Sequence, residues 1–228
     1  PFMVVHAALA VVLARLSATD DIAIATPIAG RGQAVLEPLV GMFVNTLVLR
    51  ADVTPGMSFT DLLEQVRATD LNAFAHADVP FESVVEALDP VRSEAFEPLA
   101  QVILSFAPGA SLADADITVD GLSVQAMPLP YSPAPRDLTV EIIPTGSQWR
   151  GHTTYATDLF DESSIESMME QFVGVLEQLL DDPRRRVGDV PMQSADYLRR
   201  VATWSAGPHV DDGAVTLAGL LGAAGRGR

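Results

Sequence analysis

The sequence has 228 residues, 48% of them hydrophobic, which is enough for one large domain or two small ones with a sizeable core. Its 14 basic and 30 acidic side chains give a formal net charge of −16, which argues against nucleic acids and anionic membrane surfaces as partners. Cysteine is absent, which excludes disulfides and thiolate chemistry, and the four scattered histidines show no metal-ligand spacing.

The N-terminal segment predicts a helix over residues 2–16 that is apolar on nearly all sides and therefore buried. This run is too short to cross a bilayer and no basic region precedes it, so we expect a cytoplasmic protein without a signal peptide. Residues 21–26 read as a core strand. A loop over residues 27–38, which contains Gly30-Arg31-Gly32, leads to the next strand.

The stretch from residue 40 to residue 50 is almost continuously apolar, which predicts a strand buried on both faces of a sheet. Asn45 interrupts the apolar pattern. A buried amide must be hydrogen-bonded or it costs about 1–3 kcal/mol. Either Asn45 ties down a neighbouring loop, or it lines a polar site at the edge of a sheet.

Two helices follow this strand. Ser58 and Asp61 form a capping-box pattern at the start of a helix that runs to about residue 75. Asp78 and Pro80 favour the start of a second helix over residues 81–88, with Asp78 as its cap. His76, at the junction, is either a structural hydrogen-bonding group or a general base.

The remaining elements predict strands at residues 99–106, 138–143 and 149–157, and a strand or hairpin within 117–127. Asp161 begins a long helix that ends near residue 180, residues 181–192 read as a linker, and a short helix covers 194–204. Helices and strands alternate first and strands cluster later, which predicts an α/β two-layer sandwich with a mixed β-sheet and packed helices. Both ends look cut, so we expect a fragment of a longer protein.

The residues alone give no complete catalytic set. There is no Gly-x-Ser-x-Gly elbow and no phosphate-binding loop. Arg31 is either a surface loop arginine or the buried partner of a carboxylate supplied by another part of the protein.

Three motifs nevertheless resemble those of condensation domains from non-ribosomal peptide synthetases, in the same order and spacing. The first is Gly-Met-Phe-Val-Asn-Thr at 41–46 with Arg50, and the second is His-Ala-Asp-Val-Pro-Phe-Glu at 76–82. The third runs from Arg92 to Val102 and contains Pro98. Thr26 to Arg31 and Tyr155 to Phe160 add to the resemblance.

The resemblance implies a two-lobed parent domain in which each lobe is like chloramphenicol acetyltransferase. Residues 1–192 are then the C-terminal lobe, and residues 193–228 are a linker and the beginning of an adenylation domain. The family's His-His-x-x-x-Asp-Gly motif is absent from this sequence. The catalytic histidine is therefore expected in the N-terminal lobe, and no catalytic or metal-binding residue is expected here.

The resemblance also implies site residues and partners. Arg31, Asn45 and Thr46 are expected to support the tunnel between the lobes, with Arg31 paired to the motif's aspartate, and residues 107–135 are expected to cross over as a latch. The other motif residues are expected to be structural: His76, Asp78, Pro80, Phe81, Glu82, Arg92 and Pro98. Expected partners are the N-terminal lobe, carrier domains with phosphopantetheine arms and an adenylation domain.

The leading hypothesis is thus part of a peptide-bond-forming domain of bacterial secondary metabolism, inactive alone. The alternative is a non-catalytic or epimerising relative that acts as an interaction platform or isomerase. A third possibility is a free-standing acyltransferase, against which the adenylation-like tail argues.

Overall fold

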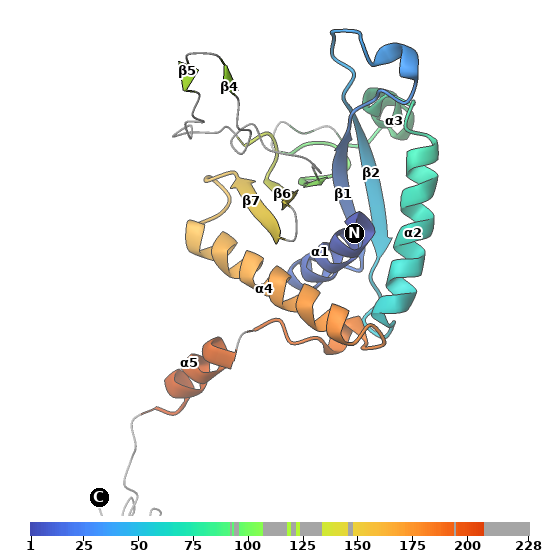
Figure 1. Cartoon of the computed structure of the whole chain (residues 1–228). Helices are drawn as coiled ribbons and strands as arrows, with labels where there is room; N and C mark the ends of the chain where they lie inside the picture. Colours follow the sequence, from blue (N-terminus) through green and yellow to red (C-terminus); the bar gives the residue numbers. More distant parts are fainter. Residues whose placement is uncertain are drawn as a thin grey trace, which may run out of the picture. The chain divides into compact units, whose positions relative to one another are not determined.

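A computed structural model describes residues 1–91, 93, 96–106, 118–119, 122–123, 134–145, 148–193 and 195–207. The chain divides into two compact units, Pro1–Met192 and Gln193–Arg228. The first unit contains the sheet and four of the helices (Figure 1). In the second unit the described residues form helix α5, Ala195–Ser205, close to the predicted range.

The first unit is built on a five-stranded mixed sheet with the strand order β2-β1-β3-β6-β7. The three central strands β1, β3 and β6 are parallel, and the edge strands β2 and β7 are antiparallel to their neighbours. The bounds are β1 Asp21–Ile28, β2 Asn45–Asp52, β3 Val102–Phe106, β6 Leu138–Thr145 and β7 Gln148–Tyr155. A separate short hairpin pairs β4 (Thr118–Val119) with β5 (Leu122–Ser123), as predicted.

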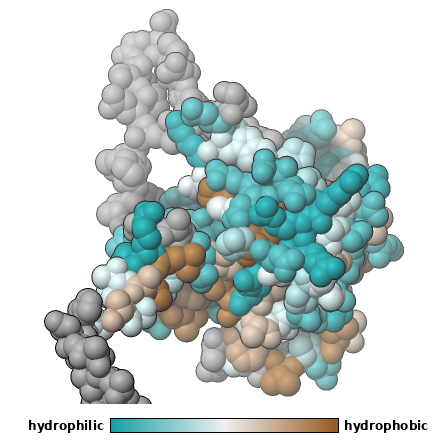
Figure 2. Space-filling view, turned by 90° about the horizontal axis from the view of Figure 1, so that it is seen from below, coloured by the Kyte–Doolittle hydropathy of each residue, from teal (hydrophilic) through white to brown (hydrophobic). Residues whose placement is uncertain are grey.

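Helix α1 (Phe2–Ser17) lies at the centre of the helical layer, because it contacts β1 and both neighbouring helices, α2 (Phe59–Ala75) and α4 (Glu162–Asp181). Figure 1 shows α2 and α4 on either side of α1. Most of α1 is buried, as its all-round apolar sequence predicts. The predicted two-layer α/β sandwich is confirmed. Seen from below, most of the molecular surface is hydrophilic, with separate hydrophobic areas (Figure 2).

Local sequence signals explain several helix starts. Ser58 and Asp61 make the predicted reciprocal capping box at the start of α2. Asp161 is the N-cap residue of α4, as predicted, although its side chain makes no capping hydrogen bond. Helix α3, Phe81–Leu88, has the predicted bounds, but its N-cap is Pro80 and no side-chain cap is present. The prediction that Asp78 caps α3 was therefore wrong.

The strand predicted from residue 40 begins only at Asn45. Strand β1 ends at Ile28, which pairs with Asn45, so residues 40–44 have no strand partner. They belong instead to a loop with a short 3-10 helix, Ala34–Leu36. Val40 and Met42 are 103% and 87% exposed, which contradicts their predicted burial.

Most of the segment at residues 181–192, which was predicted to be a linker, packs against the rest of the first unit. Val187 and Gly188 donate backbone hydrogen bonds of 3.0 and 2.9 Å to carbonyl oxygens in the turn at residues 55–57. The Arg15 guanidinium donates to two carbonyl oxygens of the same segment, at 3.0 and 3.1 Å. The fold of this unit therefore continues to Met192.

Candidate functional site

The Asn45 side chain joins the start of β2 to the loop that precedes α3. Its Nδ2 donates to the backbone carbonyls of Ala77 at 2.9 Å and Val79 at 2.8 Å. Its Oδ1 accepts from the backbone N–H of Thr46 at 2.9 Å and of Phe81 at 3.1 Å. The amide thus uses two donors and two acceptor positions.

Three of these four bonds connect the first sequence motif to the second, and the fourth, to Thr46, stays within the first. Phe81 is the first residue of α3, and the first N–H groups of a helix have no partner within it. Asn45, on β2, accepts the hydrogen bond from the Phe81 N–H, and Asp78 does not cap the helix. The bonds match the interpretation in which Asn45 ties down a neighbouring loop. A position of Asn45 and Thr46 beside an inter-lobe tunnel stays a prediction.

The loop between β1 and β2 is shaped by Arg31. Its Nη1 donates to the carbonyl oxygens of Leu36 and Leu39, the latter at 2.9 Å. The guanidinium carbon lies 4.2 Å from the centre of the Phe43 ring, which is a cation–π contact. Arg31 is therefore bound within its own loop.

The outer side of this loop is apolar. Its members, which we call the loop surface, are between 50% and 103% exposed: Val35, Leu39, Val40, Met42 and Val44. Scattered exposed apolar residues are normal, whereas a contiguous apolar segment of chain is typical of an interaction site.

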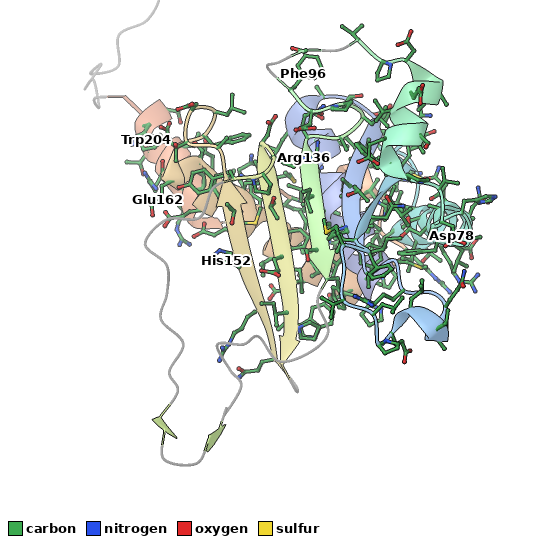
Figure 3. All side chains as sticks on the ribbon, turned by 90° about the horizontal axis from the view of Figure 1, so that it is seen from above. Asp78, Phe96, Arg136, His152, Glu162 and Trp204 are labelled. Atoms are coloured by element: carbon green, nitrogen blue, oxygen red, sulfur yellow. The ribbon has the colours of Figure 1, made fainter. Side chains whose placement is uncertain are left out.

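The second and third motifs meet at a cavity of about 670 Å³. Phe81 and Glu82 contribute from α3, and Pro98 contributes from the loop before β3. Phe96 and Arg136, both labelled in Figure 3, also line the cavity. The Arg136 Nη1 atom lies 2.7 Å from a carboxylate oxygen of Glu97, also in the lining, and its guanidinium lies 5.8 Å from the Phe81 ring centre.

His76 occupies the end of α2 and is exposed. Its Nδ1 lies 2.8 Å from the carbonyl oxygen of Asn72, and its ring borders a 220 Å³ cavity shared with Thr46 and Phe81. Asp78 is exposed, with its location marked in Figure 3. Arg92 and most of the predicted latch, residues 107–117, 120–121 and 124–133, lie outside the described residues.

The sequence reasoning missed a buried polar pair between α1 and α2. His6 Nδ1 lies 3.1 Å from Asp70 Oδ2, and both side chains are 0% exposed. Among the described residues, His6 Nε2 and Asp70 Oδ1 have no hydrogen-bond partner. The signal was present, because Asp70 continues the inner-face spacing of Leu62 and Val66, and His6 interrupts an apolar helix.

The described part of the chain contains neither a metal-binding cluster nor a membrane-spanning helix. Its histidine, aspartate and glutamate side chains form no group of three that could hold a metal ion. None of its helices combines the length and apolarity needed to cross a membrane. His152 lies on β7, apart from Phe96 and Arg136 in Figure 3.

Comparison with known proteins identifies the family. The family model of the condensation domain matches residues 2–197. A probable non-canonical nonribosomal peptide synthetase, CymA, of Salinispora arenicola is 44% identical over 201 residues, which cover 85% of this chain and 2% of that protein. A dimodular nonribosomal peptide synthase of Bacillus subtilis is 36% identical over 214 residues, covering 90% of this chain and 9% of that protein. The chain thus spans a small part of these relatives.

Solved structures agree with this result. A four-domain nonribosomal peptide synthetase bound to AMP and glycine superposes with a TM-score of 0.76 at 25% identity, covering 85% of this chain and 16% of that one. The X-domain from teicoplanin biosynthesis gives a TM-score of 0.76 at 29% identity, covering 83% of this chain and 43% of that one. The family model spans nearly the whole first unit, and the chain therefore belongs to the condensation-domain family of nonribosomal peptide synthetases.

Proposed function

We propose that this chain is part of a condensation domain that forms a peptide bond between two carrier-bound substrates. Residues 1–192 act as its C-terminal lobe, and residues 193–228 act as a linker and the beginning of an adenylation domain. The observation that carries the proposal is the match of the family model to residues 2–197, in a sequence that contains none of the family's His-His-x-x-x-Asp-Gly motif. The catalytic histidine then belongs to the partner lobe.

The reaction is an acyl transfer from sulfur to nitrogen. The acceptor amine attacks the carbonyl carbon of the donor thioester, a C–N bond forms, the C–S bond breaks, and the amine proton is transferred so that the donor arm leaves as a thiol. Both substrates are held by phosphopantetheine arms on carrier domains, so no cofactor needs to bind this chain itself. Holding both reactants in one tunnel makes the step effectively unimolecular.

The contribution of this chain is the wall of that tunnel. Arg31, Asn45 and Thr46 belong to one continuous piece of structure, the β1–β2 loop and the start of β2. The apolar loop surface provides the contact area for the partner lobe. We place the parent synthetase in the cytoplasm, in bacterial secondary metabolism.

The test is peptide formation on two carrier domains loaded with aminoacyl phosphopantetheine, followed by mass spectrometry of the intact carriers. The chain alone is expected to give no dipeptidyl product. The complete condensation domain, with an intact histidine motif in its other lobe, is expected to give the product. The proposal is overturned if the chain alone forms the dipeptidyl product, or if the complete domain with an intact histidine motif forms no product.

A second candidate is a non-catalytic or epimerising relative that acts as an interaction platform. The observation in its favour is the similarity to the teicoplanin X-domain, which has also been solved as a complex with OxyB at 30% identity and a TM-score of 0.70. The same assay separates the two candidates. If the domain is an interaction platform, the complete domain has a degenerate histidine motif, forms no dipeptide and still binds its partner protein.

A further inference from the structure

The β1–β2 loop folds back on itself at a point where only glycine fits. Gly30 has a φ of +62°, a region that L side chains rarely adopt. A Cβ atom at this position would lie 1.7 Å from the carbonyl oxygen of Phe43, which no side-chain adjustment can relieve. The two ends of the loop therefore touch through backbone atoms.

Arg31 closes the loop from the inside. One nitrogen of its guanidinium donates to the carbonyl oxygens of Leu36 and Leu39, at the end of the 3-10 helix and just beyond it. The Cζ atom of the guanidinium lies over the Phe43 ring, 4.2 Å from the ring centre. A single side chain thus contacts both halves of the loop.

We propose that Arg31 and Phe43 form a staple that gives the loop its shape before any partner arrives, and that both are positioning residues for the docking of the rest of the condensation domain. The identity of the docking partner rests on the proposed function, whereas the staple itself does not. Arg31 holds the shape of its own loop, and the loop in that shape then docks on the second lobe.

Both roles are compatible with one guanidinium. The two hydrogen bonds use Nη1, and within the described residues neither Nε nor Nη2 makes a hydrogen bond. These two nitrogens form a fork that can bind a carboxylate in a bidentate manner. A loop already held in one conformation also binds a partner at a lower entropic cost than a flexible loop.

The staple is tested by amide hydrogen exchange on the 228-residue chain. The N–H groups of Leu36 and Leu39 donate within the loop at 2.9 and 3.2 Å, so their exchange reports the loop conformation. Because the cation–π contact contributes a factor of about tenfold, Phe43→Ala is expected to speed this exchange about tenfold. Arg31→Ala, which also removes the two hydrogen bonds, is expected to speed it at least as much, and the double variant no more than Arg31→Ala alone. Phe43→Tyr, which keeps the ring face, should retain the protection.

Met42→Ala is the matched control, because Met42 is adjacent to Phe43 and 87% exposed. It should leave the exchange of Leu36 and Leu39 unchanged. Unchanged exchange in Arg31→Ala and Phe43→Ala overturns the staple, as do additive effects of the two substitutions. Since this measurement involves no catalysis, it stands or fails independently of the proposed function.

A second readout separates positioning from simple charge. In the complete domain, Arg31→Lys keeps the positive charge but cannot stack on the ring or hold the same fork. We expect peptide formation in Arg31→Lys to fall about as far as in Arg31→Ala, and Phe43→Ala to fall with them. Full activity in Arg31→Lys, or in Phe43→Ala, contradicts a positioning role.

Discussion

Replacing Asn45 by alanine removes four hydrogen bonds, three of which hold the start of β2 to residues 77–81 at the start of α3. A hydrogen bond of this kind contributes about 0.5–1.5 kcal/mol net. One of the four is exposed and the others are partly buried, so water replaces part of the loss. We expect Asn45→Ala to lower the free energy of unfolding by about 2–3 kcal/mol, which at a slope near 2 kcal/mol per M shifts the urea midpoint by about 1 M.

Urea titration followed by far-UV circular dichroism measures this shift. Asn72→Ala is the matched control, because Asn72 is an exposed asparagine on α2, and its effect should stay within about 0.5 kcal/mol. Asn45→Asp retains both acceptor positions but turns a carboxylate oxygen toward two carbonyl oxygens, so it should be at least as destabilising as alanine. If Asn45→Ala matches the control, the amide does not hold the two motifs together.

Three further predictions concern other contacts. Gly188→Ala would put a Cβ atom 2.7 Å from a facing carbonyl oxygen, so we expect the free energy of unfolding to fall by about 1–3 kcal/mol and trypsin to cleave faster at the preceding arginines. Unchanged cleavage would show that the segment is not packed. His6→Ala strands the buried Asp70 carboxylate, so a loss of about 3–5 kcal/mol is expected, which replacement of both residues by leucine should largely reverse. The Arg50 side chain, through its hydrogen bond, lowers the pKa of the Asp21 carboxyl below its usual 3.8. This exposed pair makes a small contribution to the free energy of unfolding, which is complete above pH 3.8 and is lost as the pH falls through the lower pKa of the folded state. Acid denaturation of Arg50→Gln should lack this pH dependence.

The helices were predictable because their signals are local. Ser58 and Asp61 define the start of α2 through a capping box that needs only four consecutive residues. The long helix α4 follows from the spacing of Ile165, Phe172 and Leu179, all buried. These patterns depend on the chain itself and not on what packs against it.

The loop surface was misjudged because apolar side chains for a core and for an interface look the same in a sequence. Val40 and Met42 continue the apolar run of β2, yet the partner strand ends at Ile28, which leaves them exposed. The family motif located Asn45, but its actual partners depend on how the loop before α3 folds. Periodicity places His6 and Asp70 each on the buried face of its own helix, but it cannot show that two residues 64 positions apart form a pair.

Oxidation of Met42 by hydrogen peroxide reports directly whether the rest of a condensation domain covers the loop surface. Met42 is 87% exposed here, whereas Met192, the internal reference, is 6% exposed. We expect Met42 to oxidise rapidly in this chain and about tenfold or more slowly in the complete domain, since thioether oxidation follows exposure, with Met192 slow in both. Equal oxidation rates of Met42 in the two proteins would mean that the partner lobe leaves the loop surface uncovered.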